Sequence, residues 1–385
     1  MKSLTEGAER LVPNAAFEFL AKAKALERQG KKVLHFEIGE PNFDTPEHIC
    51  EAAIKALRGG KTRYVNSNGI LELREAICEE VEKTRGFRPD VDQILVAPGG
   101  NPLIFYLVSC VVEQHQNIAL QDPGFLTYYS VLKYTGIKGN FVRLKEKNEF
   151  RLDPEDLNSA IDDDTRLIIL NSPSNPTGGV MKKSEIERVA EIAEERDIYL
   201  LSDEIYSKMT YDYPHHSAAI RDQCNERTIL LDGFSKSYAM TGWRLGYAVG
   251  PKEVIKKMSM VLEATVSCTP DFLQYGGIAA LKGPQYVDDM MRTFRERRDV
   301  LIEGLNSIPK LSCVTPQGAF YAFPNITKTG MNSSEFADFA INELGIALLP
   351  GTAFGPGGEG YVRLSYATSI ETIKEAVERL KAGLR

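Results

Sequence analysis

From Gln93 onward, short apolar runs alternate with longer segments of helical character, and this alternation limits the folds open to the chain. Helix-like segments such as 101–113 and 183–196 separate the runs, which cover residues 93–97, 117–121, 166–171, 198–202, 228–232 and 245–249. Continuous Val/Ile/Leu strands are typical of a mostly parallel sheet with helices on both faces. The sequence therefore predicts an α/β fold.

Chemically active residues follow four of these predicted strands. Gly99 and Gly100 come after the first strand, Asn175 after the third, Asp203 after the fourth and Lys236 after the fifth. In open α/β sheets, ligands bind beyond the carboxyl ends of the strands. We therefore expect these residues to lie near one edge of the sheet.

Lys236 lies in a loop of small and hydroxylated residues between two predicted strands, and Arg244 follows it in the same loop. Partial shielding from water lowers the pKa of a lysine, and a neutral amine can form a Schiff base. Arg244 provides a cation that suits a phosphate group. Taken alone, however, the Ser-Lys-Ser segment is more typical of a solvated surface loop.

Three further motifs accompany this loop: Asn171–Gly178 (NSPSNPTG), Ser202–Tyr206 (SDEIY) and Tyr361–Ser365 (YVRLS). In this order, with the lysine loop, they resemble the aspartate aminotransferase-like family of fold-type I pyridoxal-phosphate (PLP) enzymes. The resemblance extends from about Asn14 to the C-terminus. It implies a large PLP-binding domain at 44–285, with its mostly parallel sheet covered by helices, and a smaller α/β domain from 1–43 and 286–385.

The resemblance also implies catalytic roles. Lys236 matches the Schiff-base lysine that moves the substrate proton, and Asp203 matches the carboxylate that pairs with the pyridine nitrogen. Tyr206 and Asn175 match hydrogen-bond donors to the phenolate oxygen of PLP, and Phe125 matches the aromatic ring stacked on the pyridine. Taken alone, Asp203 also fits a helix N-cap, Asn175 a turn and Phe125 a core helix.

The cofactor phosphate requires an anion site. Glycine amides at a helix N-terminus provide one, although a Gly-Gly pair also fits a plain turn. The residues expected around the phosphate are Gly99, Gly100, Asn101, Ser235, Arg244 and, from a second subunit, Tyr64. The segment Asn101–Pro102 departs from the family pattern, and no cation stands at Asn101 to recognise an acidic substrate side chain.

Arg363 matches the arginine that binds the substrate α-carboxylate, with Gly39 and Asn175 beside it. A planar guanidinium fixes a carboxylate through two parallel hydrogen bonds. The residues expected near the substrate side chain are Phe17, Ile38, Asn101, Tyr128, Phe354 and, from the second subunit, Asn66. Most are apolar or neutral, so a neutral or aromatic substrate is as consistent with the sequence as aspartate or glutamate.

Composition argues against several other classes. The net charge of −7 over 385 residues provides no electrostatic footprint for nucleic acid. The longest apolar run, Leu103–Val112, is too short to span a bilayer, and the N-terminus lacks a signal-peptide pattern. The six cysteines include no CxxC pair, which is typical of reduced thiols in the cytoplasm.

Two polar segments are interpreted as solvent-exposed. His215–His216 is expected in an exposed turn, and we expect no metal site there or elsewhere. The arginines of the predicted helix 285–306 (Arg292, Arg295, Arg297 and Arg298) are expected to form a solvated helix face.

We expect a homodimeric cytoplasmic PLP-dependent aminotransferase with shared active sites, which exchanges an amino group between an amino acid and a 2-oxo acid by a ping-pong mechanism. The alternative within the same fold is a PLP-dependent lyase or replacement enzyme that performs β- or γ-elimination, ring-forming elimination or decarboxylation. An aminotransferase-like sensor domain of a transcription regulator is disfavoured, because no basic winged helix precedes the first helix.

Overall fold

The computed structural model describes residues 3–385, which form a seven-stranded sheet in the order β2-β8-β7-β6-β5-β3-β4. All neighbouring strands are parallel except β8, which runs antiparallel to both β2 and β7. In sequence order the strands are β2 Ile94–Ala97, β3 Asn117–Asp122, β4 Lys138–Arg143, β5 Thr165–Asn171, β6 Tyr199–Asp203, β7 Thr228–Gly233 and β8 Gly246–Val249. The predicted α/β class and mostly parallel sheet are confirmed.

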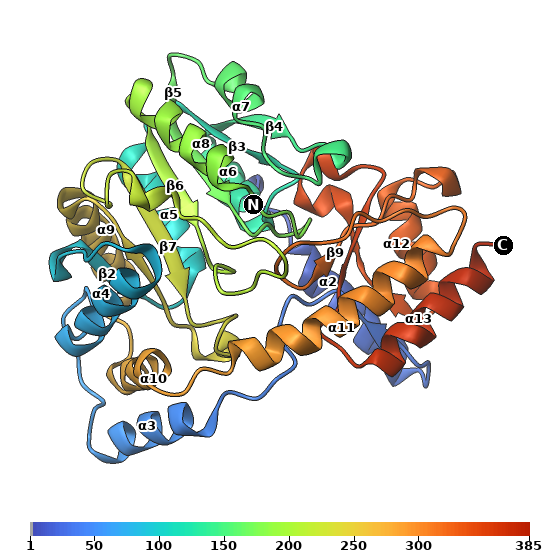
Figure 1. Cartoon of the computed structure of the whole chain (residues 1–385), viewed down its shortest axis with the longest axis horizontal. Helices are drawn as coiled ribbons and strands as arrows, with labels where there is room; N and C mark the ends of the chain where they lie inside the picture. The colour runs from blue at the N-terminus through green and yellow to red at the C-terminus, as the bar shows by residue number, and fades with distance from the viewer. Residues whose placement is uncertain (1–2) are drawn as a thin grey trace.

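Consecutive side chains of a strand point to opposite faces of the sheet, and helices cover both faces, so both are buried. Leu167 and Ile169 pack in one cluster, whereas Ile168 and Leu170 pack in another. The first face is covered by α5 Gly100–Val111, α6 Leu126–Thr135 and α9 Lys252–Val266, and the second by α4 Leu71–Arg85, α7 Pro154–Ala160, α8 Lys183–Glu195 and α10 Asp271–Lys282. Helix α3, Glu47–Arg58, packs against α10 (Figure 1).

The two ends of the chain meet in the remaining part of the molecule. Strand β1, Leu34–His35, pairs in parallel with β10, Ile346–Ala347, and β12, Val362–Ser365, lies between β11, Leu349–Pro350, and β9, Tyr321–Ala322. The accompanying helices are α1 Glu6–Glu9, α2 Ala15–Arg28, α11 Val287–Asn306, α12 Ser333–Asn342 and α13 Ile370–Gly383. In Figure 1, α11 runs from the sheet region toward α13 and the C-terminus.

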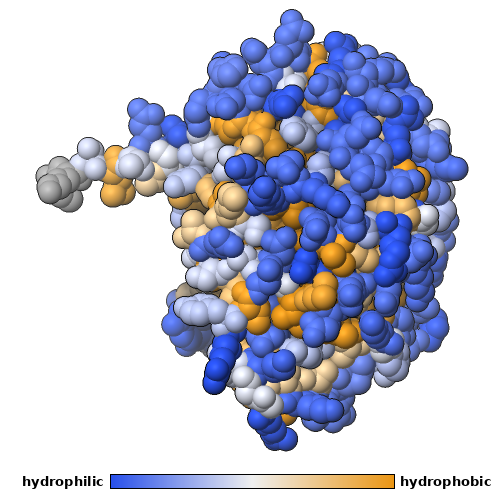
Figure 2. Space-filling model, turned by 90° about the vertical axis from the view of Figure 1, so that its left-hand side faces the viewer, coloured by the Kyte–Doolittle hydropathy of each residue, from blue (hydrophilic) through white to orange (hydrophobic). Residues whose placement is uncertain are grey.

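The N-terminal segment carries apolar side chains on the surface. Its first described residues project from the body of the molecule in Figure 2, and Arg10 anchors the segment by donating hydrogen bonds to the carbonyl oxygens of Lys133 and Tyr134. Leu4 and Val12 remain more than half exposed.

Among residues 3–385, no helix is long and apolar enough to cross a membrane.

Two expectations about exposed polar segments are wrong. Arg292 and Arg295 face solvent, but Arg297 and Arg298 are buried, because their flat guanidinium groups stack on aromatic rings of the core. His215 is also largely enclosed, because its ring nitrogen Nε2 contacts a carboxylate oxygen of Glu204 at 2.9 Å. Charge alone does not decide exposure where a buried partner is present.

Candidate active site

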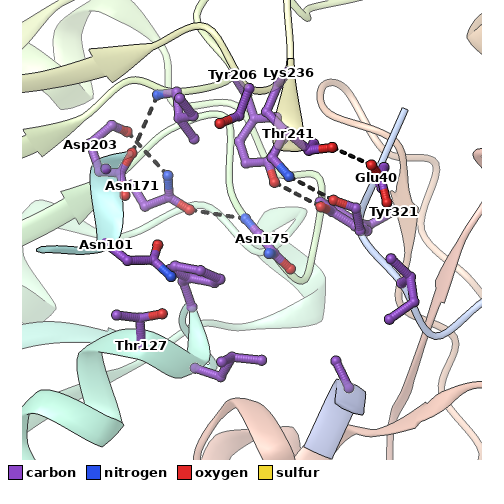
Figure 3. Close-up of a pocket in the computed structure, with 18 of the residues that line it drawn as sticks. Glu40, Asn101, Thr127, Asn171, Asn175, Asp203, Tyr206, Lys236, Thr241 and Tyr321 are labelled. Carbon is purple, nitrogen blue, oxygen red and sulfur yellow. Dashed lines mark hydrogen bonds between the residues drawn. The ribbon is translucent and has the colours of Figure 1, made fainter. Parts of the chain in front are cut away.

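A cavity of about 310 Å³ opens at the carboxyl ends of the central strands (Figure 3). Its wall combines residues from β5, β6 and β7, the start of α5, the segment after β1 and strand β12. The predicted site residues in the wall are Gly39, Gly100, Asn101, Phe125, Asn175, Asp203, Tyr206, Ser235, Lys236, Arg244 and Arg363. Residues distant in the sequence thus meet at the predicted edge of the sheet.

Lys236 faces this cavity from the loop after β7. Its ammonium nitrogen Nζ donates a 2.6 Å hydrogen bond to the carbonyl oxygen of Gly39. Loss of hydration, reinforced by the cations Arg363 and Arg244 and opposed by Glu40, lowers the pKa of Lys236 to about 8. The amine is therefore much closer to losing its proton near neutral pH than an exposed lysine is.

Asp203 ends β6 and is buried with no cation against it in the described part of the chain. Burial raises the pKa of Asp203 to about 6, although a 2.5 Å hydrogen bond donated by the Tyr128 hydroxyl opposes the rise. The backbone N–H of Ile205 also donates to this carboxylate, at 3.3 Å. A buried carboxylate with these neutral donors suits a positively charged ligand group.

Tyr206 and Asn175 approach the cavity from two different loops. The hydroxyl oxygens of Tyr206 and Tyr321 lie 2.7 Å apart, within hydrogen-bonding distance. The side-chain oxygen of Asn175 accepts a 3.3 Å hydrogen bond from Nη1 of Arg363, which leaves the Asn175 amide nitrogen as its donor group. Its backbone N–H is held at 3.0 Å by the side-chain oxygen of Asn171 (Figure 3).

Arg363, on β12, is clamped between two aromatic rings, with its guanidinium carbon 4.7 Å from the ring centre of Tyr321 and 5.0 Å from that of Phe354. Its Nη2 donates a 2.5 Å hydrogen bond to the carbonyl oxygen of Glu37. The buried Nε has no partner among residues 3–385. A rigid guanidinium with an unused donor is suited to bind an anionic group such as a carboxylate.

The start of α5 forms the other end of the cavity. Gly99 caps this helix with φ of 91°, and a Cβ atom built there would lie 2.3 Å from Nη2 of Arg244. Gly100 and Ser235 line the wall nearby, so free backbone N–H groups of the helix N-terminus and a cation face the same space. This combination is an anion site of the kind that binds phosphate.

Some expected residues lie elsewhere. Phe17, Ile38 and Asn101 line the cavity, but Tyr128 and Phe354 do not. Tyr128, which was expected near the substrate side chain, instead donates its hydroxyl to the carboxylate of Asp203. Tyr64 is 87% exposed and lies outside the wall formed by this chain.

The structure adds site residues that the sequence analysis missed. Asn171 and Tyr321 line the cavity, as do Glu40 and Thr241, which are hydrogen-bonded to each other. The position of Asn171 at the end of an apolar run, like that of Asp203, was a usable signal. Tyr321 had none, because only the packing of β9 beside β12 brings its hydroxyl to Tyr206.

The chain belongs to the family described as aminotransferase class I and II, which matches residues 31–380. Members of this family use PLP as their cofactor. The chain is 40% identical to an aromatic-amino-acid aminotransferase of Thermococcus litoralis over 92% of each chain, and 36% identical to an aspartate aminotransferase of Bacillus subtilis over 98% of each.

The solved structures agree with this assignment. The aspartate aminotransferase from Thermus thermophilus with maleate superposes with a TM-score of 0.95 at 36% identity, and all of each chain is covered. The fold and the relatives together support a PLP-dependent aminotransferase. The alternative of an elimination, replacement or decarboxylation enzyme is not favoured, because the relatives that match over nearly the full length of the chain are named as aminotransferases.

Proposed function

We propose that the cavity around Lys236 binds PLP and is the site at which the chain transfers an amino group between an amino acid and a 2-oxo acid by a ping-pong mechanism. The observation that carries this proposal is the arrangement of Lys236, Asp203 and Arg363 on one cavity wall. It brings together an amine with a lowered pKa, a buried carboxylate and a clamped guanidinium.

Three features of the wall fit the cofactor and substrate groups. Asp203 is a buried carboxylate that suits the protonated pyridine nitrogen, and the unpartnered Nε of Arg363 suits the substrate carboxylate. The space between Gly99 and Arg244, which a Cβ atom would fill, suits the phosphate. Phe125, Asn175, Tyr206 and Ser235 complete the cofactor contacts, with Gly39 and Asn175 beside the substrate.

When bound, PLP supplies an electron sink for the negative charge left after the substrate α-carbon loses its proton. Lys236 is the Schiff-base lysine and the proton carrier, because a pKa near 8 lets Nζ both accept and return a proton near neutral pH. Asp203 stabilises positive charge on the ring nitrogen. Arg363 would bind the α-carboxylate of the amino acid and so orient it in the cavity.

The experiment that tests this proposal follows the visible absorbance of purified protein supplied with PLP. Addition of a single amino acid should change the band, release the matching 2-oxo acid and leave a form that a second 2-oxo acid restores. Lys236→Ala should abolish the cycle, whereas Lys252→Ala, on the surface, should not. Failure to bind PLP, or release of ammonia, pyruvate or carbon dioxide in place of the 2-oxo acid, contradicts the proposal.

We further propose a cytoplasmic homodimer in which Tyr64 and Asn66 of each subunit complete the partner's site, with the two-domain division expected from the sequence. The 87% exposure of Tyr64 and the exposed apolar side chains of the N-terminal segment support an interface. Mixing inactive Lys236→Ala chains with inactive Tyr64→Ala chains should restore partial activity, because one site of a mixed dimer has both native residues. No recovery after subunit exchange contradicts shared sites.

A further inference from the structure

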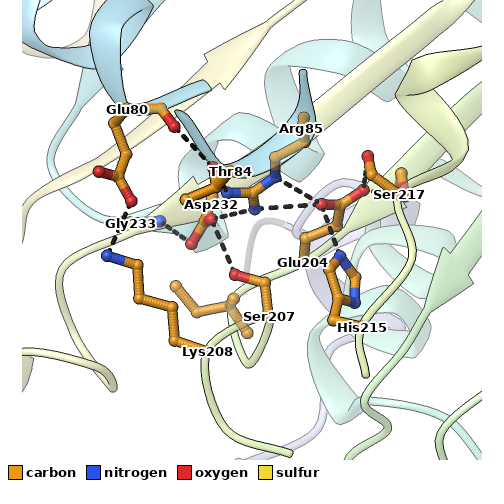
Figure 4. Close-up of polar contacts among 12 residues, drawn as sticks. Glu80, Thr84, Arg85, Glu204, Ser207, Lys208, His215, Ser217, Asp232 and Gly233 are labelled. Atoms are coloured by element: carbon orange, nitrogen blue, oxygen red, sulfur yellow. Dashed lines mark hydrogen bonds and ion pairs between the residues drawn. The ribbon is translucent and has the colours of Figure 1, made fainter. Parts of the chain in front are cut away.

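Behind the wall of the cavity lies a buried ionic cluster centred on Arg85 (Figure 4). Arg85 is the last residue of α4, and only 2% of its side chain is exposed. Its Nη2 contacts a carboxylate oxygen of Asp232 at 2.6 Å and one of Glu204 at 3.1 Å. Its Nε donates a second hydrogen bond to Glu204 at 3.2 Å, and Nη1 donates to the hydroxyl of Thr84 at 2.7 Å.

The two carboxylates occupy special places in the sequence. Glu204 directly follows Asp203, and Asp232 lies in β7 four positions before Lys236. Successive strand residues point to opposite faces. Asp203 and Leu231 therefore line the cavity, while Glu204 and Asp232 point away from it toward α4.

We propose that Arg85 is a positioning residue for the reaction: its guanidinium ties the ends of β6 and β7 together on the far side of the sheet and so holds Asp203 and Lys236 at their working positions. This inference rests on the proposed roles of those two residues. Nothing else among the described residues pairs with both carboxylates.

The electrostatic balance depends on Arg85. Burial raises the pKa of Glu204, but His215 and Arg85 outweigh it and lower the value to about 2. The pKa of Asp232 is raised by burial, and Arg85 opposes that rise. Without Arg85, the two carboxylates face each other in a dry environment, so they repel each other or take up protons, and the strand ends are no longer held together.

Three serine hydroxyl groups also donate hydrogen bonds to the two carboxylates that contact Arg85. Ser202 and Ser217 donate to Oε1 of Glu204 at 2.8 and 2.5 Å, and Ser207 donates to Oδ2 of Asp232 at 3.2 Å. A second contact reaches the lysine loop directly, because Lys208 donates a 2.7 Å hydrogen bond to the hydroxyl of Tyr238. Polar contacts on the side away from the cavity therefore hold the ends of β6 and β7 and the loop that carries Lys236.

The test compares Arg85→Met with Arg298→Met. Arg298 is also buried and paired with acidic residues, but it lies on α11 outside the cavity. Both variants are expected to lose stability. Only Arg85→Met is expected to lower kcat roughly 10- to 100-fold, as a displacement of about an ångström does, and to weaken PLP binding about tenfold.

A readout without cofactor separates positioning from general destabilisation. In the PLP-free protein, the pH dependence of Lys236 acetylation, followed by mass spectrometry, should have its midpoint near 8 in the wild type. In Arg85→Met the midpoint should rise, because loss of the Arg85 cation and added hydration at Lys236 both favour the ammonium. An unchanged midpoint, kcat and PLP affinity, with only a lower Tm, overturns the inference.

If Arg85→Met does not fold, Asp232→Asn serves instead, because an amide of the same size releases only the β7 end of the contact. It should lower the midpoint, because a negative charge is lost while Arg85 keeps its positive charge, and it should also cause a partial loss of kcat. No change in either overturns the inference. Failure of the proposed function appears differently: the wild type then binds no PLP, or Lys236→Ala retains transamination.

Discussion

The ammonium nitrogen of Lys236 lies 2.6 Å from the carbonyl oxygen of Gly39, in the segment that follows β1. Two residues earlier, the carbonyl oxygen of Glu37 accepts a 2.5 Å hydrogen bond from Arg363. One short segment thus contacts both Lys236 and Arg363. A carbonyl group carries only a partial negative charge, so the contact with Gly39 leaves the lysine pKa low, whereas a carboxylate partner would raise it.

The lowered pKa of Lys236 predicts a stability effect in the PLP-free protein. Because its folded-state pKa of about 8 lies below the ordinary 10.5, the unfolded chain binds more protons between these values. The free energy of unfolding of the wild type should therefore rise with pH across this window relative to Lys236→Met, by on the order of 3 kcal/mol at most. Urea unfolding of both proteins from pH 7.5 to 10.5 measures it, and parallel pH curves contradict it.

His35 should show the opposite dependence. Hydrogen bonds to Glu37 and Glu27 raise the pKa of His35 from 6.5 to about 9, against the lowering effect of burial. The stabilisation is therefore fully present below about 6.5 and is lost as pH rises through about 9. The Tm of the wild type should therefore fall between pH 6.5 and 9.5 relative to the Tm of His35→Gln, in which this pH-dependent stabilisation is absent. His115→Gln, on the surface, is the matched control and should leave the pH profile of Tm unchanged.

Tyr128→Phe should impair the proposed reaction without removing any residue of the cavity wall. Loss of the hydroxyl removes the hydrogen bond that lowers the pKa of Asp203, so that pKa should rise further above about 6. The acidic limb of the kcat/KM profile should move to higher pH, with kcat reduced roughly tenfold or more, as expected for a hydrogen bond to a charged group. Tyr129→Phe, which removes a hydrogen bond to Asp122 instead, should leave that limb in place.

Gly99→Ala should weaken PLP binding about tenfold or more, because the new Cβ atom lies 2.3 Å from Nη2 of Arg244 and displaces the guanidinium from the proposed phosphate site. Gly60→Ala is the control, since Gly60 also has a positive φ, 79°, but nothing lies within 4 Å of its Cβ position. Both variants put an L-residue at positive φ, and the strain is greater at Gly99, whose φ of 91° and ψ of 171° lie in a region almost restricted to glycine, at about 1–3 kcal/mol. Equal PLP affinities in the two, measured by absorbance titration, count against a phosphate at Gly99.

Much of the site was predictable because its residues follow strands and lie in short motifs. Asp203 and Lys236 come after Val/Ile/Leu-rich apolar runs, which are typical of buried parallel strands, and the two strands do pair in parallel. Since parallel strands end at one edge, their positions in the sequence already place them near one another. The approximate ends of β6 and β7 and the identities of these residues were therefore accessible without a structure, whereas β4 was not among the predicted strands.

The amino-acid sequence by itself determined the α/β class, which functional residues follow which strands, and the family to which the chain belongs. Only the tertiary structure decided which hydroxyl meets Asp203, which face of α11 buries its arginines, and that Arg85 joins Glu204 to Asp232. The physical reason is that these contacts join side chains far apart in the sequence. Their directions depend on how separately formed helices and strands pack, and no local pattern encodes that packing.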